Sequence, residues 1–306
     1  MNMRNTGLLF LVLGAAVPAC SSDNNSTPTD AAAGSDAASG GTPAATLSTS
    51  ATLGAHLVDK DGKTLYFYVA DVPGSPSACT GACLTTWPPA DLGTTTTVGT
   101  GLTAADFASI TTNSAAQTTW KGRPLYHYSM DAAVGDTKGE NANSGHWFVA
   151  RAYNLFFAVD STVDATAAGG TDKTTPFLTA GNGRAIYVLS TETPATTTTP
   201  PVTKCGPTDG TGTSVGACAK KWPLWAKPAT VTTPVVPSTL NAADLSSFNA
   251  ESSMVQFTYK GWPTYFYAPP DTSTPPVNVA EPAGKKSGAL VANWFAISGA
   301  WNGTTF

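Results

Sequence analysis

The sequence predicts an all-β protein built from tandem repeats of short antiparallel strands. Charged residues make up only 12% of the chain, about half the usual share, while Thr, Gly and Pro are abundant. The apolar segments of the body are short, aromatic or β-branched, and bounded by Gly, Asp or Pro, as strands are. One short phrase that ends in tyrosine occurs four times. These three observations favour repeated β units over a helical fold.

The N-terminus has the anatomy of an export signal. Arg4 is followed by the apolar run Leu8–Val17, and the small residue Ala19 precedes Cys20. A basic start, an apolar core and a small residue before the cleavage site are the parts of a secretory signal. The apolar run is about half as long as the roughly 20 residues that a membrane-spanning helix needs. The sequence therefore predicts a signal peptide at residues 1–19.

Residues 17–20, Val-Pro-Ala-Cys, resemble the lipobox of bacterial lipoproteins, although Pro18 is not the commonest residue at its place. The resemblance implies that Cys20 becomes a lipidated N-terminus and that the membrane is a partner. Ser21, rather than Asp, follows the cysteine, which in Gram-negative lipoproteins implies the outer membrane. The alternative is an ordinary secretory signal that leaves Cys20 as a spare thiol, a liability in an oxidising compartment.

A tether is expected behind the anchor, at residues 20–52. Almost all its residues are Ser, Thr, Ala, Gly, Asp, Asn or Pro. Such a segment has too few large apolar side chains to offset the loss of chain entropy on folding. We therefore expect a disordered tether that holds the folded body away from the membrane.

The repeated phrase organises the rest of the chain. It occurs at residues 62–66, 122–126, 183–187 and 261–265, so that its tyrosines are 60, 61 and 78 residues apart. An acidic residue follows the first three tyrosines by five positions and the fourth by six. The repeat motif thus consists of Tyr66, Asp71, Tyr126, Asp131, Tyr187, Glu192, Tyr265 and Asp271.

A longer repeat groups the four copies into two pairs. The odd copies lead to a Cys-x3-Trp-Pro segment, and the even copies follow a Gln-x2-aromatic-Lys segment and lead to Trp-Phe. This tandem duplication predicts two similar β domains, at residues 53–160 and 176–300, joined by a linker at residues 161–175. The alternative is one four-unit, propeller-like ring, because a single copy of about 60 residues buries little core by itself.

These motifs resemble, in the same order, the bacterial lipoproteins that carry a secreted repeat of unknown function. The resemblance rests on the tyrosine-x4-aspartate, Cys-x3-Trp-Pro and Lys-Gly-x-Pro-x-Tyr segments and covers roughly residues 53–298. It implies an extracytoplasmic lipoprotein of tandem repeats, and the family has no established activity. The second half departs from the pattern, since its cysteines are further apart and its fourth acidic residue is displaced.

Each phrase is expected to form a turn that enters a strand. Strand alternation places Tyr66 and Tyr68 on one face and Leu65 and Phe67 on the other. The acidic residue five positions after a tyrosine cannot share its face, because the offset is odd. We expect each carboxylate at the end of its strand, where it accepts backbone N–H groups of the next turn; a ligand or cation site is the alternative.

Two short helices are expected in the body. Residues 104–110 and 242–248 follow Thr103 and Asn241, which are suitable N-cap residues. Six tryptophans recur at matched places and are expected in the core, with a stacking surface for sugars or quinones as the alternative. They are Trp87, Trp120, Trp147, Trp222, Trp262 and Trp294.

Four cysteines remain when Cys20 is set aside, and four cysteines allow three pairings. Because each odd copy holds two of them, we expect Cys79 to pair with Cys83 and Cys205 with Cys218. Export favours structural disulfides. A redox pair or a thiolate metal site is the alternative.

Candidate metal ligands are few. His127, Met130 and His146 offer the imidazole and thioether groups that suit copper or haem iron. However, His127 takes a strand position that Phe or Val fills in the other copies, and His146 aligns with Asn293. These positions favour a packed imidazole and a hydrogen-bonding role, so the sequence predicts no cofactor.

Charge and motif content limit the function. Without the signal peptide the chain has 15 basic and 20 acidic residues, which argues against nucleic-acid binding. None of the common catalytic or phosphate-binding motifs is present. The sequence therefore predicts a non-enzymatic binding or structural module of the cell envelope with an unidentified envelope partner. The alternative is an extracytoplasmic redox or metal accessory protein.

Overall fold

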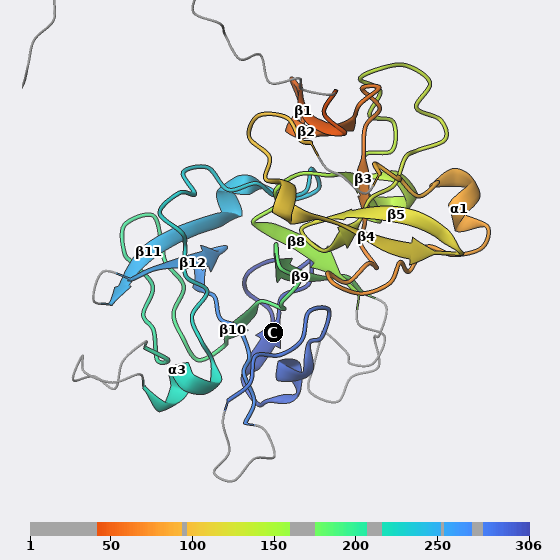
Figure 1. Ribbon diagram of the computed structural model, residues 1–306. Helices are drawn as coiled ribbons and strands as arrows, with labels where there is room; N and C mark the ends of the chain where they lie inside the picture. Colours follow the sequence, from red (N-terminus) through yellow and green to blue (C-terminus); the bar gives the residue numbers. More distant parts are fainter. Residues whose placement is uncertain (1–41, 94–96, 160–174, 207–215, 252–253, 271–277) are drawn as a thin grey trace, which may run out of the picture. The chain divides into compact units, whose positions relative to one another are not determined.

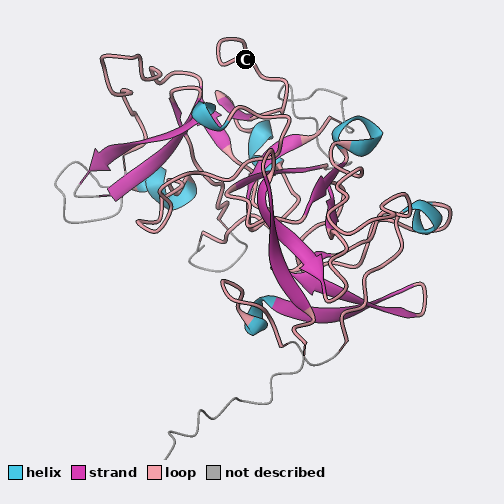
Figure 2. Ribbon diagram, turned by 90° about the horizontal axis from the view of Figure 1, so that it is seen from above, coloured by secondary structure: helices cyan, strands magenta, loops and turns pink. Residues whose placement is uncertain are grey.

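Short antiparallel strands make up most of the regular structure in this computed structural model (Figures 1 and 2). The prediction of an all-β fold made of small repeated sheets is confirmed. The structure describes residues 42–93, 97–159, 175–206, 216–251, 254–270 and 278–306. Cys20 and the signal peptide, most of the tether, residue 160 of the first domain and residues 161–174 of the linker lie outside this part. Among the described residues, no helix is long and apolar enough to cross a membrane.

The first strand lies inside the segment that was predicted to be tether. β1 (Ala45–Ser50) pairs antiparallel with β2 (Gly54–Asp59), and Ala45 and Leu57 are buried. The prediction that the tether extends to residue 52 is therefore wrong. β1 forms because the backbone of β2 supplies its hydrogen-bond partners. The small polar side chains of β1 therefore gave no sign of a strand in the sequence.

The first repeat pair forms two small sheets. β3 (Tyr66–Tyr68) pairs antiparallel with β7 (Trp147–Val149), so that the phrase of the first copy lies beside the end of the second. β4 (Phe107–Thr112), β5 (Ala115–Trp120) and β6 (Arg123–Pro124) form a three-stranded antiparallel sheet.

The second repeat pair contains the same two sheets. β10 (Tyr187–Leu189) pairs with β14 (Trp294–Ala296). β11 (Leu245–Glu251), β12 (Met254–Tyr259) and β13 (Trp262–Pro263) form the second three-stranded sheet. The duplication inferred from the sequence is thus also a duplication of strand pairing.

A further sheet connects the two repeat pairs. β8 (Leu155–Ala158) and β9 (Phe177–Ala180) are antiparallel neighbours, and every residue of both strands is buried. Figure 1 shows them side by side. Residues 40–306 form one compact unit. The independence of the two predicted domains and the ring alternative stay predictions.

The helices expected after Thr103 and Asn241 end after one turn. Ala104–Asp106 (η1) and Ala242–Asp244 (η2) are 3-10 turns that lead directly into β4 and β11. The longer helices were a wrong prediction, because a short helix is marginal alone and the following hairpin offers the backbone a full set of partners. The Asn241 side chain still accepts a hydrogen bond from the next turn, as expected of a cap.

The remaining helical segments are also short, and Figure 2 shows them as isolated single turns. They are α1 (Cys83–Thr86), α2 (Ala142–Gly145), α3 (Ala217–Lys221) and η3 (Ser287–Leu290). α1 and α3 follow the odd phrases, and α2 and η3 precede β7 and β14. Helical turns therefore also occupy matched places in the two halves.

The two faces of the phrase strands contact different cores. Leu65 and Phe67 belong to a large apolar cluster that also contains Ile186 and Val188 of the second half. Tyr66 belongs to a smaller cluster confined to the first half, and Tyr68 packs against it. This division confirms the alternation expected for the strand.

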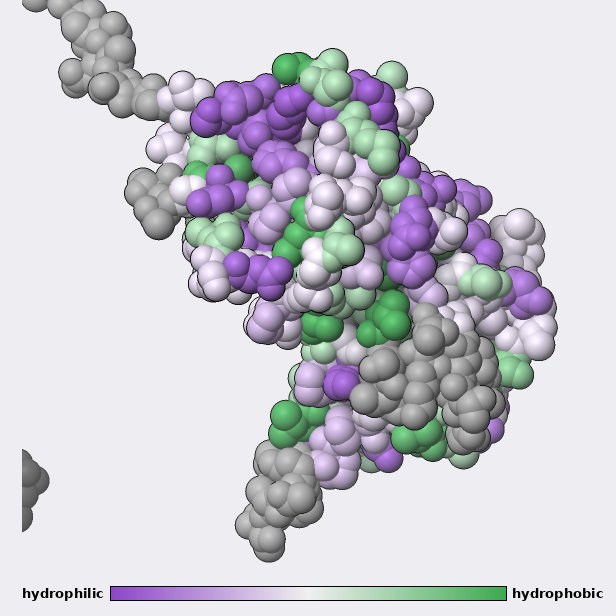
Figure 3. Space-filling model, turned by 90° about the vertical axis from the view of Figure 1, so that its right-hand side faces the viewer, coloured by the Kyte–Doolittle hydropathy of each residue, from purple (hydrophilic) through white to green (hydrophobic). Residues whose placement is uncertain are grey.

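The face in Figure 3 has hydrophilic residues spread over its upper part and apolar residues in small separate patches. Apolar side chains scattered in this way are ordinary on an exposed protein surface.

Candidate functional site

The repeated tyrosines bind one another through their backbones. The Tyr66 N–H donates to the Tyr126 carbonyl at 2.9 Å, and the Tyr126 N–H donates to the Tyr66 carbonyl at 3.1 Å. Tyr187 and Tyr265 repeat this reciprocal pair, with both distances 2.9 Å. Each odd copy is therefore joined to the even copy that follows it.

The hydroxyl of each tyrosine donates to the carboxylate of the other copy, and we call this reciprocal arrangement the exchange. Tyr66 donates to Asp131 Oδ2 at 2.6 Å, and Tyr126 donates to Asp71 Oδ2 at 2.8 Å. Neither tyrosine uses the acidic residue of its own copy for this bond. The tyrosine and the acidic residue of the repeat motif therefore form hydrogen bonds between copies and not within one copy.

Each carboxylate also holds the loop that follows it. Asp71 accepts the N–H of Ala78 at 2.7 Å, and Asp131 accepts the N–H of Lys138 at 3.0 Å. These are backbone contacts of the kind that the odd spacing predicts for a carboxylate at a strand end. The carboxylates of the first half therefore tie a strand, a loop and the opposite tyrosine together.

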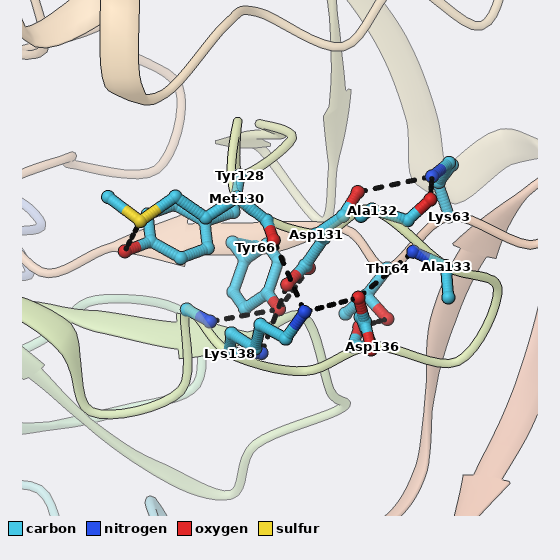
Figure 4. Close-up of polar contacts among 11 residues, drawn as sticks. Lys63, Thr64, Tyr66, Tyr128, Met130, Asp131, Ala132, Ala133, Asp136 and Lys138 are labelled. Carbon is cyan, nitrogen blue, oxygen red and sulfur yellow. Dashed lines mark hydrogen bonds and ion pairs between the residues drawn. The ribbon is translucent and has the colours of Figure 1, made fainter.

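The surroundings of Asp131 are shown in Figure 4, in which the Tyr66 hydroxyl points at this carboxylate. The Lys63 ammonium donates to the Asp131 carbonyl at 3.1 Å. Lys138 forms an ion pair with Asp136 at 2.8 Å. The cations near Asp131 are therefore engaged by backbone carbonyl groups or by another carboxylate.

The second half repeats the exchange. Tyr265 donates to Glu192 Oε1 at 2.8 Å, and Tyr187 donates to Glu281 Oε2 at 2.6 Å. Glu192 Oε1 also accepts the N–H groups of Lys204 and Cys205, at 2.7 and 3.1 Å. The same architecture therefore recurs with glutamates.

Glu281 is the site residue that sequence reasoning missed. The sequence assigned the fourth acidic position to Asp271, which lies outside the described residues. A usable signal was a glycine eight residues after Asp131 and seven residues after Glu281, namely Gly139 and Gly288. The N–H groups of these glycines reach the hydroxyls of Tyr66 and Tyr187 at 3.3 and 3.2 Å.

Burial controls the ionisation of these groups. It raises the pKa of Tyr66 and Tyr126 far above the ordinary value, and the neighbouring carboxylates raise it further. Burial also raises the pKa of Asp71 to about 6, although the Ala78 N–H, the Tyr126 hydroxyl and Arg123 lower it. The tyrosines therefore stay protonated at neutral pH and act as donors.

Burial raises the pKa of the other three carboxyls as well, and in each case a tyrosine hydroxyl acts in the opposite direction. These groups are Asp131, Glu192 and Glu281. Neutral phenols that donate to carboxylates hold structure together and are poor nucleophiles or bases. The geometry therefore suits cross-linking of the copies better than catalysis.

Stacked aromatic rings lie beside each cluster. Trp87 and Trp147 stack with their centroids 3.8 Å apart, and Tyr128 and Tyr68 extend the stack at 4.3 and 4.4 Å. Trp222 and Trp294 repeat the central pair at 3.7 Å. All six tryptophans that were expected in the core are buried.

The two predicted disulfides are confirmed. Cys79 pairs with Cys83 and Cys205 with Cys218, at Cα–Cα distances of 5.5 and 5.3 Å, within the usual range. The carbonyl of Cys83 accepts the N–H of Trp87 at 2.9 Å. The disulfide loops therefore help to position the stacked tryptophans.

The candidate metal ligands have separate surroundings. His127 lines a cavity of about 220 Å³ and lies 3.7 Å from Asp59; burial lowers its pKa, although Asp59 raises it. The His146 ring lies 2.6 Å from the Asn143 carbonyl. Met130 is 61% exposed. The described part of the chain holds no group of three or more His, Cys, Asp or Glu that could hold a metal ion.

Comparison with protein-family models found matches in the first repeat pair. Residues 48–91 and 110–151 match the model described as a secreted repeat of unknown function. These segments contain both tyrosine–carboxylate bonds of the first half, Tyr66 with Asp131 and Tyr126 with Asp71. Comparison with curated proteins and with solved structures gave no match. The first repeat pair therefore contains two tandem segments that are similar to the secreted repeat of unknown function.

Proposed function

We propose that this protein is a lipid-anchored, non-enzymatic repeat protein that serves as a binding or structural module of the cell envelope. The observation that carries the proposal is the reciprocal exchange between Tyr66–Asp131 and Tyr126–Asp71. The polar groups that recur in the repeats are buried and bonded to one another, and so rigidify the body. A rigid body behind a long N-terminal segment suits the display of a surface to a partner.

The anchor is supported by the lipobox at residues 17–20 and by the description of the family repeat as secreted. We expect a clickable fatty acid fed to expressing cells to label the wild-type protein and not Cys20→Ser. The double variant Cys79→Ser/Cys83→Ser is the matched control and should keep the label. Equal labelling of wild type and Cys20→Ser would refute the anchor. In Gram-negative cells we expect the labelled protein in the outer-membrane fraction.

The absence of enzymatic activity and the envelope partner are both part of the proposal. Affinity capture from detergent-solubilised envelopes, with the anchored wild type as bait, should recover one or a few envelope components. Cys20→Ser bait added to the same extract tests whether capture needs the anchor or only the body. Recovery of no component by either bait would contradict the binding role.

A redox or metal accessory protein is the competing hypothesis. It predicts disulfides that reduce readily under native conditions, or copper or iron that copurifies with the protein. Cys79 and Cys205, the first cysteine of each pair, are buried. Burial hinders thiol exchange. Thiol counting with and without mild reductant, combined with elemental analysis, separates the hypotheses. Two inert disulfides and no metal would reject the competing one.

A further inference from the structure

A cavity of about 280 Å³ has three cationic side chains in its wall, those of Lys121, Arg123 and Arg151. The other lining residues are Phe67, Ala152, Tyr153, Asn154 and Gly181. The lining contains no carboxylate. Three positive charges around one small cavity repel one another unless an anion compensates them.

Arg123 is the most enclosed of the three cations, with an exposed fraction of 3%. Burial lowers its pKa to about 10, although Asp71 raises it, so the guanidinium stays charged at neutral pH. Nη1 donates to the Asp71 carbonyl at 3.0 Å, and the group packs on the Phe156 ring at 4.6 Å. Among the described residues, its Nη2 has no hydrogen-bond partner.

Arg151 is half-buried, and its Nη1 donates to the Val236 carbonyl at 3.5 Å. Its Nε is buried and has no hydrogen-bond partner in the described part of the chain. The guanidinium carbon lies 5.7 Å from the centre of the Tyr153 ring. Buried guanidinium N–H groups without an acceptor are unfavourable, and the cavity that both arginines line offers an acceptor from solvent a place to bind.

Asp71 acts on Arg123 and Glu140 on Arg151 through charge, but both carboxylates accept their hydrogen bonds from other groups. Asp71 accepts from Ala78 and Tyr126. Glu140, which lies near Arg151, accepts the Val149 N–H at 2.7 Å. Asp106 pairs with Lys121 at 2.7 Å, which leaves the two arginines as the principal cations of the cavity.

The second half shows that the fold does not require these cations. Trp262 takes the place of Arg123 in the repeated phrase, and Ser298 follows Trp294 as Arg151 follows Trp147. Beside Ser298 lies a cavity of about 230 Å³ that is walled mainly by apolar side chains. The cationic lining is therefore a property of the first repeat pair.

We propose that the cavity lined by Arg123 and Arg151 binds a small soluble oxyanion, a phosphate or carboxylate group. Planar guanidinium groups match both anions in shape and donate paired hydrogen bonds to them. The volume admits such a group with a few further atoms rather than a large ligand. The inference rests on the binding role proposed above and gives it a ligand class; it does not depend on the lipid anchor.

The test is calorimetric titration of the purified protein with inorganic phosphate, and then with sulfate and acetate. We expect saturable binding of phosphate that Arg151→Gln weakens by about tenfold or more. Arg184→Gln is the matched control, because Arg184 also has a buried Nε without a partner among the described residues but does not line this cavity. Arg184 donates to the Tyr267 carbonyl and packs on Phe266. The control should bind phosphate like the wild type.

Arg151→Gln carries the test because Arg123 is too deeply packed to be replaced safely. Near-ultraviolet circular dichroism of the stacked tryptophans verifies that each variant is folded. No saturable heat up to about 10 mM phosphate, or equal affinity in wild type and Arg151→Gln, would overturn the proposal. Binding to vesicles that contain anionic phospholipid without binding of free phosphate would overturn it too. Fatty-acid labelling of Cys20 is scored separately, so the two proposals can fail independently.

Discussion

Tyr66 donates its phenol hydrogen to Asp131, 65 residues further along the chain, with an oxygen–oxygen distance of 2.6 Å. In the reciprocal bond, the Tyr126 hydroxyl donates to Asp71 at 2.8 Å. Asp71 lies beyond the end of β3, the strand of its own tyrosine, and bonds to the tyrosine of the neighbouring copy. These two bonds therefore join the first copy to the second.

Removal of the hydrogen bond between Tyr66 and Asp131 should destabilise the protein. We expect Tyr66→Phe to lower the free energy of unfolding by about 1–3 kcal/mol, because it leaves Asp131 and the Gly139 N–H without their buried partner. The measurement is chemical denaturation followed by tryptophan fluorescence. Tyr128→Phe, which loses only a contact with exposed Met130, is the control, and an equal loss in both variants would contradict the prediction.

The raised pKa of Asp71 predicts a defined pH dependence. The folded-state pKa is about 6 and the unfolded value is near 4, so this group favours folding most below pH 4. Its contribution is lost as the pH rises through 6. We expect Asp71→Asn to gain stability relative to wild type between pH 4 and pH 7, by up to about 3 kcal/mol. Urea unfolding at several pH values tests this, and a difference that does not change with pH would count against it.

The fourth acidic position has two candidate residues, Glu281 from the structure and Asp271 from the sequence motif, and mutation can distinguish them. Glu281→Ala removes the acceptor of the Tyr187 hydroxyl and of the Gly288 N–H, and we expect a loss of about 2–4 kcal/mol. Asp271→Ala is the comparison variant, because the sequence motif assigned the role to that residue. Thermal unfolding of both decides: a larger loss for Asp271→Ala would reject the assignment of Glu281.

The two disulfides should differ in their contribution. Loop-closure entropy predicts about 2 kcal/mol for the short Cys79–Cys83 loop and about 3 kcal/mol for the longer Cys205–Cys218 loop. We therefore expect the paired serine variant of the second disulfide to have the lower melting temperature. Calorimetric melting of both paired variants provides the comparison. The reverse order would show that packing around Cys79, and not loop closure, dominates.

Local patterns in the sequence determined the fold class, the repeats and the disulfide pairing. Leu65 and Phe67 alternate with Tyr66 and Tyr68, and this period of two sets the two faces of a strand without knowledge of its neighbours. The pairing of Cys79 with Cys83 followed from their presence in one copy. These features depend on residues that are close in the chain.

Only the tertiary structure decided which distant groups meet. Asp131 as the partner of Tyr66, and Glu281 as the partner of Tyr187, depend on strand pairing between segments 65 and 94 residues apart. β1 and the strands that replaced two expected helices depend on a partner strand for their backbone hydrogen bonds. The gathering of Arg123 and Arg151 around one cavity has the same origin, because the side chains of a repeat acquire neighbours only when its copies pack.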